Sequence, residues 1–122
     1  MDTSLALIII GAVSLLIGTV FNALPIPVNQ KIMGDLHEAA VRPAASIRTM
    51  TGAFAMAIGV TALYCRNLPA EEAGTLLTGL GIGYIILLVT LVLTKVRGLL
   101  DHLPVPPMII FAIFIFLAFY AK

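Results

Sequence analysis

The sequence predicts an all-α integral membrane protein: four transmembrane helices in an antiparallel bundle, plus a short interfacial amphipathic helix between the first and second spans. Hydrophobic residues make up 61% of the 122 residues, charged residues make up 11%, and the mean hydropathy is +1.12. A soluble domain of this size could not bury so much apolar surface. Strand alternation of the barrel type is absent, so helices are expected to satisfy the backbone in lipid. We expect one transmembrane domain over residues 1–122.

Four apolar segments are candidates for the spans. Each is close to the roughly 17–25 residues that a spanning helix needs, although the last is short and would stand nearly upright. Prolines mark the connections, at Pro25 and Pro27, at Pro69 and at Pro104. The first segment lacks the basic start of a signal peptide, so we expect a retained helix. The four segments are residues 4–24, 47–65, 74–94 and 107–121.

Basic residues predict the orientation of these spans. They are more frequent around the first and third connections than on the opposite side, so the positive-inside rule places these two connections in the cytoplasm. Both termini are then expected outside, in a bacterial inner membrane. The residues counted are Lys31, Arg42 and Arg48, then Lys95 and Arg97, against Arg66 and Lys122.

Residues 28–41 are predicted to form the interfacial helix. Apolar residues recur there at every fourth position, which gives the helix one apolar face. On the other side, Lys31 is spaced to pair with Asp35, and Glu38 is spaced to pair with Arg42. We therefore interpret most charges in "GDLHEAAVRPAASIR" as a water-facing, salt-bridged stripe.

This stripe does not explain Arg48. With Ser46 as a helix cap, Arg48 is predicted in the first turn of the second span, where the helix dipole disfavours a cation. Such an arginine can snorkel to lipid phosphate, bind an anion or pair with an acid from a neighbouring connection. Because the first and third connections are predicted at one membrane face, we expect an anion-binding site there. Its candidate residues are Arg48, Arg97, Asp101, His102, His37 and Glu38.

Several other kinds of site are not expected. "DLHE" and "DH" match no strong metal-ligand spacing, so we expect neither a metal nor a cofactor. Cys65 is the only cysteine and cannot form an internal disulfide. A net charge of +1 offers no footprint for nucleic acid.

Small residues recur at helix-packing spacings in the first three segments. We favour close packing inside one subunit, and we also expect a homo-oligomer, a dimer or a trimer. The residues are Gly11, Ser14, Gly18, Gly52, Gly59, Gly79, Gly81 and Gly83.

From residue 47 onward the chain also resembles a known group. "SIRTMTGAFAMAIGVTAL", followed by "KVRGLLDHLPVPP", resembles the small four-helix bacterial integral membrane proteins of unknown function (the DUF4345-like group). The resemblance rests on Arg48, Gly52, Arg97 and the proline-broken start of the last helix. It implies a four-helix membrane fold and no established reaction.

Membrane-associated glutathione and eicosanoid enzymes are also four-helix proteins of this size. Their second helix looks like Arg followed by Asn and then Glu on one face. Here Arg48 is followed by Gly52 and Phe54, so we do not expect glutathione chemistry.

The sequence favours a binding role: a lipid or another anionic amphiphile held at the cytoplasmic end of the bundle. A membrane enzyme acting on a lipidic substrate stays open, with proton transfer by His37, Glu38, Asp101 or His102. Transport of a hydrophobic small molecule also stays open, whereas ion transport is disfavoured because no charge lies in the middle of a span. The polar residues there are Thr19, Thr61, Thr78, Tyr84 and Thr90.

Overall fold

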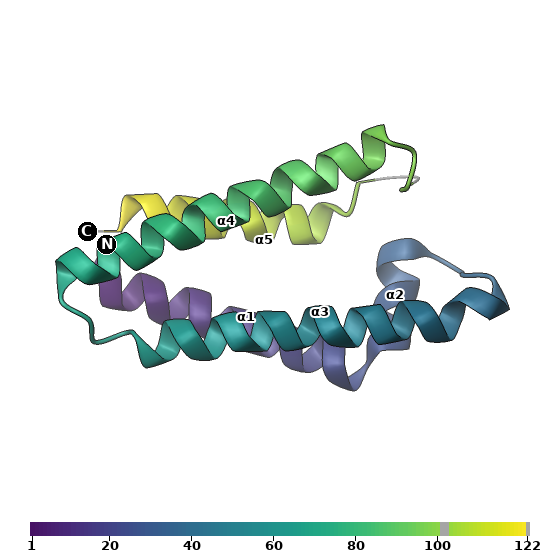
Figure 1. The fold of residues 1–122 in the computed structure, drawn as a ribbon, viewed down its shortest axis with the longest axis horizontal. Coiled ribbons are helices and arrows are strands. Elements are labelled where there is room, and N and C mark those ends of the chain that lie inside the picture. The colour runs from purple at the N-terminus through teal and green to yellow at the C-terminus, as the bar shows by residue number, and fades with distance from the viewer. Residues whose placement is uncertain (101–102, 122) are drawn as a thin grey trace. The chain divides into compact units, whose positions relative to one another are not determined.

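The computed structural model describes residues 1–100 and 103–121, and this part of the chain contains five α-helices and no strand (Figure 1). The all-helical fold class is therefore confirmed. The chain divides into two compact units, one of residues Ile8–Tyr64 and one of Met1–Leu7 with the chain from Cys65 onward. The helices are α1 (Thr3–Ala23), α2 (Pro25–Met33), α3 (Glu38–Tyr64), α4 (Ala70–Val96) and α5 (Val105–Tyr120).

Three helices, α1, α3 and α4, are long and apolar enough to cross a membrane. The fourth apolar helix, α5, has 16 residues and is shorter than a typical span. The length and composition of these helices therefore indicate a membrane protein. The predicted spans at 4–24 and 74–94 correspond to α1 and α4, whereas α3 begins well before the predicted residue 47.

The connection between α1 and α3 differs from the single helix predicted over residues 28–41. Helix α2 ends at Met33, and α3 begins at Glu38. Between them, Gly34 adopts a φ of +76°, a left-handed conformation that glycine tolerates and that interrupts a helix. The apolar residues that recur at every fourth position therefore belong to two separate helices and do not form one continuous helical face.

The predicted salt-bridged stripe is wrong. In the part of the chain that the structure describes, neither Lys31 with Asp35 nor Glu38 with Arg42 forms an ion pair. Lys31 and Asp35 do not share a helix, so the i, i+4 spacing no longer brings them together. All four side chains are exposed, where an ion pair gains little.

In the unit of residues Ile8–Tyr64, α1 and α3 run antiparallel with their backbones in contact (Figure 1). Gly11 lies against Gly59, and Gly18 lies against Gly52 about two helical turns away. A Cβ on Gly18 would lie 2.5 Å from the Gly52 carbonyl oxygen, and one on Gly59 would lie 2.7 Å from that of Gly11. The predicted packing of these glycines inside one subunit is confirmed.

In the other unit, α4 and α5 run antiparallel side by side (Figure 1). The buried Tyr84 ring packs between two α5 rings, with centroids 5.9 Å from Phe111 and 5.1 Å from Phe114. Gly81 lies against Phe119, and a Cβ at Gly81 would stand 2.6 Å from that ring. Packing of the α5 aromatic rings on Tyr84 and on the small residue Gly81 joins α5 to α4.

The backbone contact between α1 and α3 predicts different effects for two glycine substitutions. Gly59→Ala should lower the free energy of unfolding by about 1–3 kcal/mol, because its methyl group must separate two backbones. Gly74→Ala is the matched control, because no atom lies within 4 Å of a Cβ built there. Alanine should leave stability unchanged or raise it by up to about 1 kcal/mol.

Thermal unfolding of the two variants in the same lipid nanodiscs measures this difference. Equal melting temperatures would contradict the close packing of α1 on α3.

Candidate functional site

Arg48 lies in the interior of α3, so its predicted position in a first helical turn is wrong. The helix begins at Glu38, Arg48 is its eleventh residue, and Ser46 does not cap it. The helix also continues through Pro43, a residue type more usual at a helix start. The helix start is about 15 Å from Arg48, beyond the reach of its dipole. Repulsion by that dipole therefore gives no reason for Arg48 to bind an anion.

Two other helices, α1 and α2, supply side chains that contact Arg48, all within Ile8–Tyr64. Its Nε donates a hydrogen bond of 2.8 Å to Oδ1 of Asn29 on α2. Its guanidinium carbon lies 5.1 Å from the centroid of the Phe21 ring on α1, within cation–π range. We call Phe21, Asn29 and Arg48 the Arg48 site.

The glycine contact between α1 and α3 brings Phe21 to this position. A Cβ built on Gly52 would lie 2.8 Å from the Phe21 Cβ, so a larger residue at position 52 would displace the ring. Asn22, the next residue on α1, donates from Nδ2 to the Thr49 carbonyl oxygen at 3.3 Å. The Arg48 site thus lies beside the Gly18–Gly52 contact.

The positive charge of Arg48 has no acidic partner among the described residues. No carboxylate in residues 1–100 or 103–121 forms an ion pair with it, and its terminal nitrogens make no hydrogen bond there. The side chain is nevertheless partly buried. One edge of the guanidinium is held by Asn29 and one face lies over Phe21. The two terminal nitrogens can therefore donate together to one oxyanion.

Asn29 contributes a second unmatched donor. Its side chain is only 3% exposed. Because an arginine Nε can only donate, the amide oxygen of Asn29 must face it, and the amide nitrogen is directed elsewhere. That Nδ2 atom is buried and has no hydrogen-bond partner in the part of the chain that the structure describes. A buried donor left in this state costs about 1–3 kcal/mol, which is a clear cost to the stability of the unit.

His37 and Glu38 lie at the start of α3, and the structure does not bring them to Arg48. Nδ1 of His37 accepts a hydrogen bond of 3.1 Å from the backbone N–H of Ala39, so the imidazole caps the helix. Glu38 is the first residue of α3, where the helix dipole favours an acid. Both residues have a local structural role about 15 Å along the helix from Arg48.

Arg97 lies in the other unit, as the exposed C-cap residue of α4. Gly98 follows with a φ of +77°, and the amides of Gly98 and Leu99 donate to the carbonyl oxygens of Lys95 and Thr94. This is a Schellman motif, which ends the helix. The predicted location of Lys95 and Arg97 at the helix end is confirmed.

Asp101 and His102 lie outside the described residues. A common site for Arg48 and Arg97 therefore stays a prediction, as do the roles proposed for Asp101 and His102.

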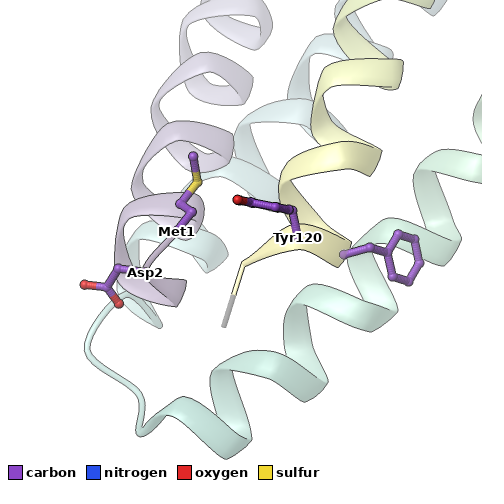
Figure 2. Close-up of a pocket in the computed structure, with 4 residues that line it drawn as sticks. Met1, Asp2 and Tyr120 are labelled. Carbon is purple, nitrogen blue, oxygen red and sulfur yellow. The ribbon is translucent and has the colours of Figure 1, made fainter.

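An open hollow of about 680 Å³ lies elsewhere, lined by Met1, Asp2, Phe119 and Tyr120 (Figure 2). It contains none of the predicted site residues. Asp2 is its only charged side chain, and its Oδ1 accepts a hydrogen bond of 3.2 Å from the backbone N–H of Ser4. This carboxylate therefore caps the first turn of α1.

The threonines predicted at mid-membrane depth are satisfied inside their own helices. The hydroxyls of Thr19, Thr61, Thr78 and Thr90 each donate to the carbonyl oxygen four residues earlier, at 2.7–2.8 Å. In residues 1–100 and 103–121, no three His, Cys, Asp or Glu side chains come together to hold a metal ion.

Comparisons of the chain with protein-family models, with curated proteins and with solved structures find no match. The fold and the site together define a class: an all-helical membrane protein with a partly buried arginine held by side chains from two other helices.

Sequence reasoning identified Arg48 and missed Phe21 and Asn29. One signal for Asn29 was present, because it is the first strongly polar residue after the apolar stretch "LPIPV". Its contact with Arg48 joins residues 19 positions apart, which helical spacing alone could not predict.

The cap formed by His37 can be tested independently of the Arg48 site. His37→Ala should weaken the first turn of α3 by about 0.5–2 kcal/mol, because the Ala39 amide loses its acceptor. Hydrogen exchange at that amide should become faster, while His37→Asn should restore protection. Unchanged exchange in His37→Ala would contradict a capping role.

Proposed function

We propose that this protein is a four-span membrane protein that binds the anionic group of a lipid or another amphiphile at Arg48. The observation that carries the proposal is a partly buried guanidinium whose terminal nitrogens have no acidic partner in the described residues. Burying a cation without a counter-charge is costly. An oxyanion at these nitrogens removes most of that cost.

The length of α3 supports a site near the membrane surface. Its 27 residues extend about 40 Å, longer than a hydrocarbon core of about 30 Å. Counting about 20 residues back from Tyr64 places the hydrocarbon boundary near Ala45. Arg48 then lies about one turn inside that boundary, where an arginine side chain reaches phosphate and carboxylate groups.

Helix α2 supports the same location. It begins with Pro25 directly after α1 and packs against α3. Ile26 and Met33 expose apolar surface, and Lys31 is an exposed cation on the same short helix. This combination suits a helix in the interface, where lipid chains and anionic head groups are both within reach.

The four-span arrangement needs α5 to cross as well. At about 24 Å, α5 is shorter than the hydrocarbon core, so it must stand nearly upright or draw flanking residues into the membrane. The basic residues favour an inner-membrane protein with both termini outside. Gly79 and Gly83 are open on α4 and suit contact with a second copy, so we retain the homo-oligomer in the proposal.

This topology predicts the labelling of two introduced cysteines in inverted and right-side-out vesicles. With native Cys65 replaced by Ala, Glu38→Cys should react with an impermeant maleimide only when the cytoplasmic face is accessible. Glu71→Cys, at the start of α4, should react only from the opposite face. Reaction of both from one side would exclude the proposed orientation.

The binding proposal predicts that Arg48→Lys reduces stabilisation by anionic lipid. Lysine lacks both Nε and the paired terminal nitrogens, so it cannot hold a two-oxygen contact while bonded to Asn29. The stabilisation gained on adding phosphatidylglycerol to phosphatidylcholine nanodiscs should fall by about 1–3 kcal/mol. Arg42→Lys is the matched control, because Arg42 is exposed on the same helix and has no partner within residues 1–100 and 103–121.

Thermal unfolding in the two nanodisc compositions gives this difference. If the gain from phosphatidylglycerol is the same in both variants, Arg48 is only a snorkelling anchor.

A further inference from the structure

We infer that Asn29 is a positioning residue that holds Arg48 in place without neutralising it, so that the positive charge stays available to a bound oxyanion. This inference rests on the proposed function and adds to it the residue that sets the charge of the site. Among residues 1–100 and 103–121, Asn29 makes the one side-chain hydrogen bond of Arg48, through Oδ1 at 2.8 Å.

An amide at position 29 acts on Arg48 differently from a carboxylate. A carboxylate of the same shape would accept the same bond from Nε and offer a second oxygen to a terminal nitrogen. That side-on pair would hold Arg48 more firmly and would cancel its charge. The amide provides the first contact and omits the second.

The amide also leaves an unmatched group in a buried place. Nδ2 of Asn29 is a buried donor with no partner among the described residues, on a side chain that is 3% exposed. A carboxylate would have no donor to leave unmatched. Judged by the stability of the free protein alone, the acid is the better residue beside Arg48. The amide is the better residue if Arg48 must bind an anion from outside the chain.

The open groups define the ligand chemistry. Two guanidinium nitrogens at a fixed orientation fit two oxygens of one phosphate or carboxylate group. Phe21 supports the guanidinium from one face, and this contact needs no counter-charge. Such an oxyanion can be the head group of a lipid or a free anion from the aqueous phase.

The test uses the full chain in phosphatidylcholine nanodiscs with four variants. Asn29→Asp adds the charge at unchanged shape, and Asn29→Ser removes the amide while adding no charge. Gln30→Glu is the matched control, because it makes the same amide-to-acid change at the exposed neighbouring position on α2. Arg48→Gln removes the cation itself.

Two probes distinguish the sources of the oxyanion. Phosphatidylglycerol is titrated into the nanodisc lipid, and inorganic phosphate is titrated separately into the buffer. Native mass spectrometry measures bound phosphatidylglycerol, and the shift in melting temperature measures the response to phosphate. The melting temperature without either probe measures the stability of each variant.

Asn29→Asp should weaken binding of the effective probe roughly tenfold or more, while its melting temperature without probe is unchanged or higher. Asn29→Ser should melt at a lower temperature yet keep binding within about threefold of the wild-type value, and so should Gln30→Glu. If the role of Asn29 were purely structural, binding would follow stability. Asn29→Ser would then bind the probe more weakly than Asn29→Asp. If Asn29→Asp does not fold, a measurable loss of binding in Asn29→Ser that is much smaller than the loss in Arg48→Gln supports the inference, whereas equal losses in these two variants contradict it.

Three results would overturn the inference. Wild-type binding by Asn29→Asp, or equal losses in Asn29→Asp and Asn29→Ser, would show that the charge at position 29 does not control the site. Equal losses in Asn29→Asp and Gln30→Glu would assign the effect to general repulsion. Under each of these three results, Arg48→Gln tests the proposed function separately. Loss of binding in Arg48→Gln would leave the proposed function intact, whereas binding at the wild-type level would contradict it.

Discussion

The direct contact between the α1 and α3 backbones is the constraint on which the Arg48 site depends. Gly18 and Gly52 let the two helices approach until a Cβ on either would clash with the partner's carbonyl oxygen. In lipid, such close van der Waals packing replaces the hydrophobic force that joins helices in water. The same approach brings Phe21 to the guanidinium of Arg48, and α2 follows directly with Asn29.

The Arg48 site keeps a net positive charge within the described residues. An aromatic face and an amide oxygen hold the guanidinium, and no carboxylate joins them within the described residues. These neutral groups fix the orientation of Arg48 and leave its net charge in place. A structural salt bridge would do the opposite, because its acid would neutralise the cation. The arrangement therefore suits a protein that takes its counter-charge from a ligand.

The parts of this account that follow from sequence are those set by local patterns. Hydropathy located three long helices, glycine spacing indicated close helix packing inside one subunit, and Arg97 fell at the end of α4 as expected. The start of α3 was misplaced because its first turns are too polar to resemble a span, although the backbone is continuous there. Asn29 could not be identified because its importance arises from a contact between helices, which no helical periodicity encodes.

The central claim is that Arg48 binds one anionic group supplied from outside the chain. Mass spectrometry of lipids and small molecules retained by the protein after gentle detergent extraction tests this claim most directly. We expect one anionic amphiphile, enriched over its share of the source membrane and present in stoichiometric amount with the chain. Retention of lipids only in their bulk proportions, with no enriched anionic species, would contradict it.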